Sequence, residues 1–240
     1  MPDAKAIPPG CARFAQAGPI LWDEHPDFLV ALKPAGENFH NEGETEGFVT
    51  RLKRLPGCEG LHPVHRLDRI TSGLLLLARN TEAARGLGAM FEAGAIDKYY
   101  LALSEHKPSR KQGWVRGGML RARGGSWRLT REGEYEARTQ FLSYSVRPGL
   151  RLFVLRPHTG RTHQLRVALK SLSAPILGDE RYGGSPADRG YLHAGALRFE
   201  WQGVCFCFLQ PPDEGSVFCE PMVREQIESL APPWTLPWTG

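Results

Sequence analysis

Short apolar runs separated by turn-forming residues dominate the chain, a pattern typical of β-strands. The continuous apolar run 73–78 predicts a strand that is buried on both faces. Further strands are predicted wherever short runs are rich in apolar residues: 20–22, 28–32, 96–103, 135–145, 150–155, 192–201 and 204–209. Turn residues at 147–149 and 202–203 join the last four of these ranges into two hairpins.

Two segments have helical spacing instead. Asn80 or Thr81 can cap a helix over 82–93, and Gly94 is its stop signal. The range 162–172 places its leucines and Ala168 on one side, which predicts a second helix. Most connections are too short for helical crossovers, so the pattern predicts an α+β fold with a mixed, mainly antiparallel β-sheet and few helices.

The 240 residues suffice for a single domain. We expect a flexible leader over 1–17, a catalytic domain over 18–210, and a Pro/Trp-rich tail over 211–240 that packs on the domain. No apolar run reaches membrane-spanning length, and the start lacks the apolar core of a signal peptide. A cytoplasmic location is therefore expected, with no membrane partner.

The cysteines indicate a reducing compartment. Five scattered cysteines do not form the even set of a disulfide framework. Cys205 and Cys207 share one face of a predicted strand. A zinc pair there has no second Cys/His pair at ligand-like spacing, so two buried thiols are the preferred interpretation.

Charge is distributed unevenly, although the net charge is only +4. The segment 107–131, called here the basic segment, has eight Lys or Arg and no acid, and 137–178 has seven Lys or Arg and no acid. Conversely, 23–46 has seven acids against one lysine. Two long acid-free stretches indicate contact with a polyanion, although a solvated charged face is the simpler alternative.

The basic segment also contains two Gly-Gly pairs, which predict a hairpin-like excursion rather than a packed element. Arg121, Arg123 and Arg128 are its candidates for contact with a nucleic acid. Trp114 and Trp127 lie in the same segment and either stack on bases or anchor the hairpin to the core.

The most polar motif precedes the buried strand: His65-Arg-Leu-Asp-Arg-Ile-Thr-Ser-Gly73. The positive charges of Arg66 and Arg69 favour an ionised Asp68 between them. Such a carboxylate is a candidate catalytic group, and a satisfied aspartate in a polar turn is the alternative.

Two other motifs carry candidate site residues. The run His158-Thr-Gly-Arg-Thr-His-Gln-Leu-Arg166 places two arginines near the start of a predicted helix, where an anion or an internal carboxylate binds well. In Lys98-Tyr-Tyr100, alternation puts Lys98 and Tyr100 on one face and Tyr99 in the core.

Together these motifs resemble those of the RluA-type pseudouridine synthases. The string His-Arg-Leu-Asp-x-x-Thr-Ser-Gly is similar to the signature of that family, and Lys33-Pro-Ala-Gly36 resembles its first motif. Lys98-x-Tyr100 and Thr159–Arg166, followed by Pro175–Asp179 and Tyr182, agree in order and spacing. The similarity extends over roughly residues 18–210.

The resemblance implies an RNA-modifying isomerase with an RNA-binding cleft across the sheet and no cofactor or metal. It implies that Asp68 is the catalytic aspartate, that Tyr100 packs on the target ring, and that Arg166 pairs with the aspartate. Further roles are implied in substrate or RNA binding: Arg66 entering the RNA stack, Leu165 beneath the uracil, and Arg161, His65 and Lys33 within the motifs. The partner is structured RNA, either rRNA or tRNA.

Many relatives carry an N-terminal S4 RNA-binding domain, which we do not expect here because little chain precedes the similar region. A monomer is the default expectation. Whether Asp68 attacks C1′, attacks C6 or removes the C2′ proton stays open, as do the target RNA and its uridine.

Two rival functions remain at this point. An RNA-binding protein without catalysis has no need for Asp68, Tyr100 and Arg166 together. A metal-dependent hydrolase would use ligands drawn from His62, His65, Asp68, His158 and His163, but Pro63 disfavours the helix that would align the first three.

Overall fold

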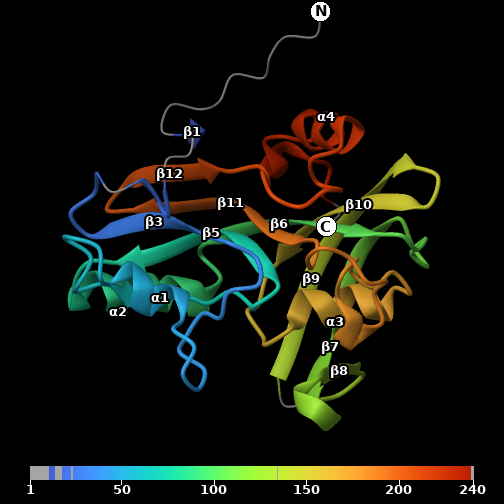
Figure 1. The fold of residues 1–240 in the computed structure, drawn as a ribbon, viewed down its shortest axis with the longest axis horizontal. Coiled ribbons are helices and arrows are strands. Elements are labelled where there is room, and N and C mark those ends of the chain that lie inside the picture. The colour runs from blue at the N-terminus through green and yellow to red at the C-terminus, as the bar shows by residue number, and fades with distance from the viewer. Residues whose placement is uncertain (1–10, 14–17, 23, 134, 239–240) are drawn as a thin grey trace, which may run out of the picture.

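The computed structural model describes residues 11–13, 18–22, 24–133 and 135–238. Twelve strands form one sheet among these residues (Figure 1). They are β1 (Cys11–Arg13), β2 (Ile20–Trp22), β3 (Phe28–Lys33), β4 (His62–Pro63), β5 (Thr71–Ala78), β6 (Asp97–Ser104), β7 (Gln112–Arg121), β8 (Trp127–Thr130), β9 (Tyr135–Arg147), β10 (Leu150–Pro157), β11 (Leu192–Trp201) and β12 (Val204–Leu209). The α-helices are α1 (Phe48–Leu52), α2 (Thr81–Ala93), α3 (Gln164–Ser171) and α4 (Pro221–Ser229).

The sheet is mixed and mainly antiparallel, as predicted. Its central order is β2-β3-β5-β11-β6-β10-β9-β7-β8, with β12 paired to β11, β1 to β12 and β4 to β5. Only the pairs β5–β11 and β1–β12 are parallel among the described strands. In the pairing register Thr71 lies beside Leu192, which lies beside Ala102. This row brings the loop before β5 close to the middle of β6.

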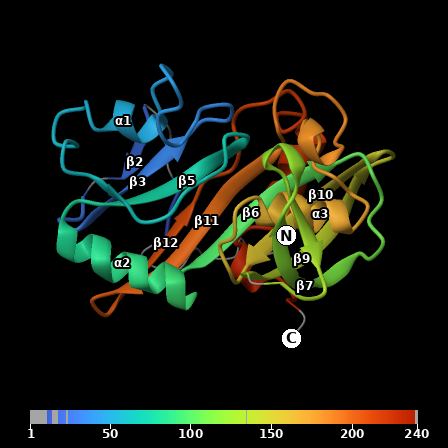
Figure 2. The same cartoon turned by 90° about the horizontal axis from the view of Figure 1, so that it is seen from below.

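Helices cover both faces of the sheet. Figure 2 shows α1 and α2 on opposite sides of β3 and β5. The alternating apolar residues of β3 explain this, because Leu29 packs in the same core cluster as Phe48 of α1, whereas Phe28 packs in the cluster of Leu87 of α2. Helix α3 adds Leu165 to the first cluster, on the face of the sheet that carries Tyr100.

The predicted helix over 82–93 is confirmed. Asn80 caps α2 by accepting the Ala83 amide at 2.8 Å, and Gly94 ends it in the left-handed conformation. Helix α3 begins at Gln164, two residues later than predicted, because His163 has a left-handed backbone with φ of 57°. The sequence pattern missed β1, β4, α1 and α4. The first three span only three, two and five residues, too few for a periodic pattern, and α4 lies within the segment expected to be a Pro/Trp-rich tail.

The prediction that the basic segment forms a hairpin-like excursion rather than a packed element is correct for the hairpin, which β7 and β8 form, but wrong for the packing. β7 is a ten-residue strand of the main sheet, paired with β9 along its length, and only β8 and its turn extend beyond. Met119 of β7 is fully buried. Gly124 and Gly125 form the turn of this hairpin with positive φ, whereas Gly117 and Gly118 serve close packing of β7 against the backbone of 130–133.

The segment near the N-terminus pairs with the sheet, and the C-terminal tail packs on it. Of the segment 1–17, residues 1–10 and 14–17 lie outside the described residues, whereas 11–13 form β1. In the tail, Val223 and Ile227 of α4 are buried, and Trp234 and Trp238 contact the ring of Tyr99, with centroids 6.2 and 5.8 Å away.

The prediction of two buried thiols on β12 is wrong for one of them. Cys207 is buried, but Cys205 is exposed near the end of the hairpin. The two sulfur atoms are 4.0 Å apart, as expected for side chains on one face of a strand.

Candidate active site

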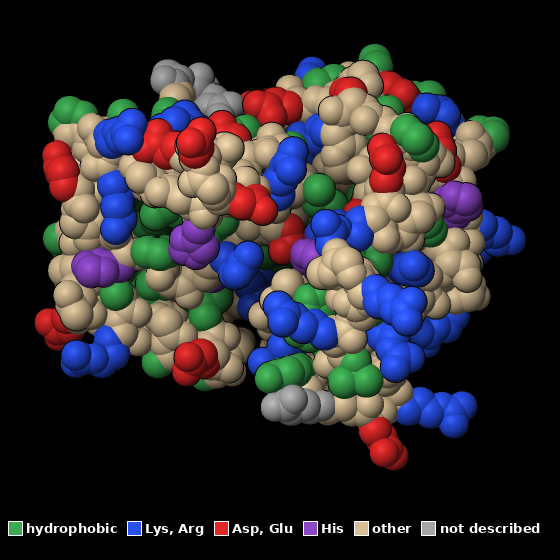
Figure 3. All heavy atoms as spheres, turned by 60° about the horizontal axis from the view of Figure 1, so that its bottom comes forward, with side chains coloured by type: hydrophobic (Ala, Val, Ile, Leu, Met, Phe, Trp, Pro, Cys, Tyr) green, Lys and Arg blue, Asp and Glu red, His purple; other side chains and the backbone are tan. Residues whose placement is uncertain are grey.

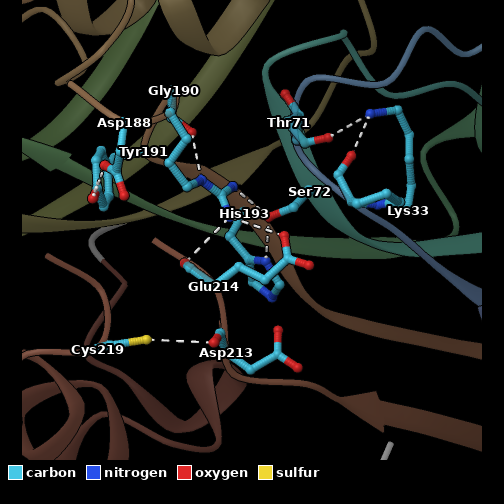
Figure 4. Close-up of polar contacts among 12 residues, drawn as sticks. Lys33, Thr71, Ser72, Asp188, Gly190, Tyr191, His193, Asp213, Glu214 and Cys219 are labelled. Atoms are coloured by element: carbon cyan, nitrogen blue, oxygen red, sulfur yellow. Dashed lines mark hydrogen bonds and ion pairs between the residues drawn. The ribbon is translucent and has the colours of Figure 1, made fainter. Parts of the chain in front are cut away.

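The loop that carries Asp68 is fixed by the turn at Lys33–Gly36. The Gly36 amide donates to the Arg69 carbonyl at 2.8 Å, and the Thr71 amide donates to the Asp68 carbonyl at 3.0 Å. Lys33 Nζ donates to the carbonyls of Pro34 and Thr71, at 2.9 and 3.0 Å (Figure 4). The first motif of the sequence is therefore a clamp on the loop before β5.

This geometry corrects the expected role of Lys33. Its side chain is 0% exposed and does not line the cleft described below, so it cannot contact RNA directly. Burial lowers the pKa of Lys33 to about 8. Its ammonium is hydrogen-bonded to the carbonyls of Pro34 and Thr71 and ties the turn at Lys33–Gly36 to the start of β5.

A cleft of about 700 Å³ opens between the Asp68 loop, β6 and the segment that leads into α3. Six of the residues proposed from the sequence line it: His65, Arg66, Asp68, Tyr100, Arg161 and Leu165. They come from three segments far apart in the chain. Its volume falls within the range of pockets that hold small molecules or single nucleotides.

Asp68 lies in the cleft with its side chain 17% exposed. Arg166 Nη1 is 3.7 Å from a carboxylate oxygen of Asp68, which is an ion pair without a hydrogen bond. The hydrogen bonds of Arg166 go to Asp179, from Nε at 2.8 Å and Nη2 at 2.7 Å. Burial opposes the charge on Arg166, but the bonds to Asp179 and the charge of Asp68 outweigh it and raise the pKa.

Tyr100 projects from β6 into the cleft and is 9% exposed. Burial, and then the negative charge of Asp68, raise the pKa of Tyr100 far above its ordinary range. The phenol therefore keeps its proton at neutral pH and can donate it in a hydrogen bond. Tyr99 packs on the opposite face of the sheet, as its position in the alternation predicts.

His65 forms part of the cleft wall, but its ring is held by the protein. Nε2 accepts the Leu76 amide at 2.9 Å, and the ring stacks on Phe91 with centroids 4.3 Å apart. Burial, and secondarily the charge of Lys98, lower the pKa of His65 to about 3. The imidazole is thus neutral and anchors the loop to β5.

The remaining basic candidates lie at the rim or beyond it. Arg66 is exposed, and Arg161 is tethered through Nε to the Glu136 carbonyl at 3.0 Å. Arg121, Arg123 and Arg128 are exposed on the β7–β8 hairpin and do not line the cleft. Figure 3 shows Lys and Arg side chains gathered on the half of the face formed by β7–β9 and α3, beside the central hollow.

The two tryptophans of the basic segment have partners within the protein. Trp114 lies against His158 at 4.8 Å between centroids, and the Arg116 guanidinium lies over its ring at 4.2 Å. Trp127 packs beside the cluster of Met119 and Tyr182. The contacts of both rings agree with anchoring.

Sequence reasoning missed a second layer of residues around the carboxylate. Besides Asp179, it includes His163 and Tyr182, whose hydroxyl is 2.8 Å from Nδ1 of His163 and also accepts the Trp127 amide at 2.9 Å. Burial lowers the pKa of His163, and Asp68 and Arg166 are among the charges that act on it. The motif that ends in Asp179 and Tyr182 was the available signal for two of the three.

Three of the four histidines proposed as metal ligands have other partners. Nε2 of His158 lies 2.8 Å from the Gln140 side-chain oxygen, and His65 and His163 are engaged as described above. Within 11–13, 18–22, 24–133 and 135–238, no group of three His, Cys, Asp or Glu is placed to hold a metal ion. No helix in this part of the chain is long and apolar enough to cross a bilayer.

Comparison with solved structures supports the fold. The chain is similar to human RNA pseudouridylate synthase domain containing 1, with a TM-score of 0.69 over 92% of this chain and 96% of that one, at 23% identity. It is also similar to human RNA pseudouridylate synthase domain containing 4, with a TM-score of 0.65 over 87% and 90%, at 24% identity.

Sequence comparison gives the family. A profile described as RNA pseudouridylate synthase matches residues 27–171. An uncharacterised RNA pseudouridine synthase of Haemophilus influenzae is 43% identical over 85% of this chain and 92% of its own length. The ribosomal large subunit pseudouridine synthase C of Escherichia coli K12 is 31% identical over 92% of this chain and 75% of its own length. The chain therefore belongs to the RNA pseudouridylate synthase family and is an RNA pseudouridine synthase, an isomerase that modifies RNA.

Proposed function

We propose that this enzyme isomerises a uridine in ribosomal or transfer RNA, with Asp68 as its catalytic carboxylate. The observation that supports it most is the convergence of Asp68, Tyr100 and Leu165 in one cleft, with Arg166 3.7 Å from the carboxylate. Several relatives named for the ribosomal large subunit make that RNA the first substrate to test.

The chemistry fits these side chains. Isomerisation breaks the N1–C1′ bond, turns the uracil and rejoins it through C5, without a net redox change. The base must leave the RNA stack to expose these atoms. In the proposal, the exposed Arg66 enters the stack in place of the base, and the extracted ring lies between Tyr100 and Leu165.

Asp68 then acts as a base or nucleophile on the extracted nucleotide, and Arg166 holds it in place. A carboxylate can do this only while ionised. Protonated Tyr100 supplies a hydrogen-bond donor next to the same ring. We propose the monomer as the active unit, because every side chain of this arrangement comes from one chain.

The decisive experiment is carbodiimide-based mapping of pseudouridine in total rRNA and tRNA from cells with and without the gene. We expect a site that disappears on deletion and returns with the wild-type gene but not with Asp68→Asn. Asp213→Asn, at an exposed position in the tail, is the matched control and should restore the site. Restoration by Asp68→Asn would exclude the proposed role of this carboxylate.

A further inference from the structure

Lys98 is a buried cation whose purpose the proposed function leaves unexplained. It lines the cleft, yet the residue is only 6% exposed. Its ammonium has no hydrogen-bond or ion-pair partner within the described part of the chain, and its aromatic contact is Phe91, with the ring centroid 5.6 Å from Nζ. A buried charge without a paired anion costs several kcal/mol in general, so its retention points to a ligand.

The neighbours of Lys98 cannot supply the missing anion. Asp97 is bound to Arg156 at 2.8 Å. His65 accepts the Leu76 amide on Nε2, so the proton of its neutral ring is on Nδ1. Nδ1 is therefore a hydrogen-bond donor, like the ammonium of Lys98, and cannot accept a bond from it. Burial lowers the pKa of Lys98, and Asp97 only partly offsets this. An anion from outside the protein would pair with the buried ammonium and offset the free-energy cost of its burial.

The position of Lys98 defines which anion fits. Lys98 and Tyr100 project from β6 into the same cleft, two residues apart. Residues i and i+2 of a strand are about 6.6 Å apart, which is close to the spacing of successive phosphates in an extended RNA strand. His158 and Arg138 add donors to the same cleft, which the carboxylates of Asp68, Glu92 and Glu136 also line.

We propose that Lys98 binds the backbone phosphate adjoining the nucleotide that packs on Tyr100. This inference rests on the proposed function and names a contact that selects an extracted nucleotide still joined to its RNA strand. It predicts that the enzyme discriminates against free uridine and against a strand whose adjoining phosphate is neutral.

The test compares Lys98→Met and Lys98→Arg with Lys53→Met, a matched change of a half-buried lysine at the end of α1. The probe is an in vitro transcript of large-subunit rRNA, bound to the full-length chain between 50 and 300 mM KCl. For Lys98→Met we expect about tenfold weaker binding at 100 mM KCl. The slope of log K against log salt should fall by about 0.7 to 0.9, the value of one phosphate contact.

Two further measurements separate phosphate binding from a structural role. Lys98→Arg should keep the salt slope, and Lys98→Met should unfold at the same or higher urea concentration than the wild type, because it removes an unpaired buried charge. An unchanged salt slope in Lys98→Met, or a marked loss of stability, would overturn the inference.

The proposed function is tested by a different measurement on the same samples. Pseudouridine formation by the wild type in the transcript reports the activity on that RNA, whereas the difference in salt slope reports Lys98. Once the target uridine is mapped, a short RNA with a methylphosphonate beside it completes the test. Neutralising that phosphate should weaken binding to the wild type and leave binding to Lys98→Met unchanged.

Discussion

Arg166 donates two hydrogen bonds to Asp179, at 2.8 and 2.7 Å, and approaches Asp68 only to 3.7 Å. Arg166 is thus held in position by one carboxylate and acts electrostatically on another. Asp179, with its side chain 1% exposed, fixes the guanidinium, and the positive charge then faces Asp68 without occupying the oxygens that must react. A direct bidentate pair with Asp68 would compete with the substrate for the same oxygens.

Removing the fixing carboxylate should therefore harm both stability and activity. In Asp179→Asn, the buried Arg166 loses its charged partner, and breaking such a buried pair typically costs about 3–5 kcal/mol. We expect a loss of this order in the free energy of unfolding, measured with urea. Turnover should fall about 100-fold, because Arg166 no longer holds a fixed position beside Asp68.

The exposed pair Arg51–Glu37 provides the control. It is shorter, at 2.6 Å, but its side chains are 49% and 39% exposed. Glu37→Gln should cost less than about 1 kcal/mol and leave turnover unchanged. Equal effects of the two substitutions would show that Asp179 has no special role.

Gly73 is expected to be irreplaceable for a steric reason. Its φ is +115°, and a Cβ atom there would lie 2.3 Å from the carbonyl oxygen of Ala194 on β11. Gly73→Ala should therefore force β5 away from β11 and lower the free energy of unfolding by at least about 2 kcal/mol. Because β5 carries the Asp68 loop, activity should fall with it.

Gly88→Ala is the matched substitution, because a Cβ atom at that position of α2 meets nothing within 4 Å. Alanine in a helix interior is favoured over glycine by about 1 kcal/mol, so this variant should be more stable than the wild type. Urea unfolding of both variants checks the pair of expectations. Similar stabilities would contradict the steric argument.

The motifs could predict the cleft because local sequence and strand alternation both act at short range. Asp68 precedes a buried strand, and alternation alone places Tyr100 and Tyr99 on opposite faces of β6. The apolar runs likewise predicted most strands. Their pairing order could not be predicted, since it depends on contacts between distant segments.

The roles of Lys33 and Asp179 were not predicted for a different reason. Lys33 is charged and belongs to a motif, so the sequence suggested RNA contact, but its ammonium donates to the backbone carbonyls of Pro34, Arg69 and Thr71. Asp179 is thirteen residues beyond Arg166, and only the fold reveals their pairing. The partner of a buried charge is a property of tertiary structure, which residue type alone does not give.

The hairpin β7–β8 should contribute to RNA affinity without contributing to chemistry. Arg121, Arg123 and Arg128 are exposed there and do not line the cleft. Replacing all three with alanine should weaken binding of an rRNA transcript and flatten its salt dependence by roughly two phosphate contacts. Turnover at saturating RNA should stay close to that of the wild type.

Alanine at three exposed arginines elsewhere provides the comparison: Arg54, Arg85 and Arg224. This second triple variant has the same net charge but leaves the hairpin intact. If the two variants showed the same salt slope, net charge rather than the hairpin would govern RNA binding.

The stability of the enzyme should fall in mild acid because of a buried histidine. His193 is 1% exposed, with Nδ1 2.8 Å from the Ser72 hydroxyl and Nε2 2.8 Å from the Gln210 carbonyl; Figure 4 shows it beside Ser72. Burial lowers the pKa of His193 to about 4, from an ordinary value of 6.5. Between these two values the unfolded chain binds a proton that the folded chain does not bind.

The free energy of unfolding should therefore decrease as the pH falls from 6.5 to 4, by up to about 3 kcal/mol from this residue alone. His193→Gln cannot take up a proton, and its amide can still donate to the Gln210 carbonyl. We expect this variant to be less stable than the wild type at pH 7, by about 1 kcal/mol for the lost bond to Ser72, but to lose less stability on acidification.

Urea unfolding at pH 7.5, 6.5, 5.5 and 4.5 measures the pH dependence of the free energy of unfolding for the wild type and for His193→Gln, with His106→Gln at an exposed position as the control. Parallel slopes for wild type and His193→Gln would mean that other groups set the acid sensitivity.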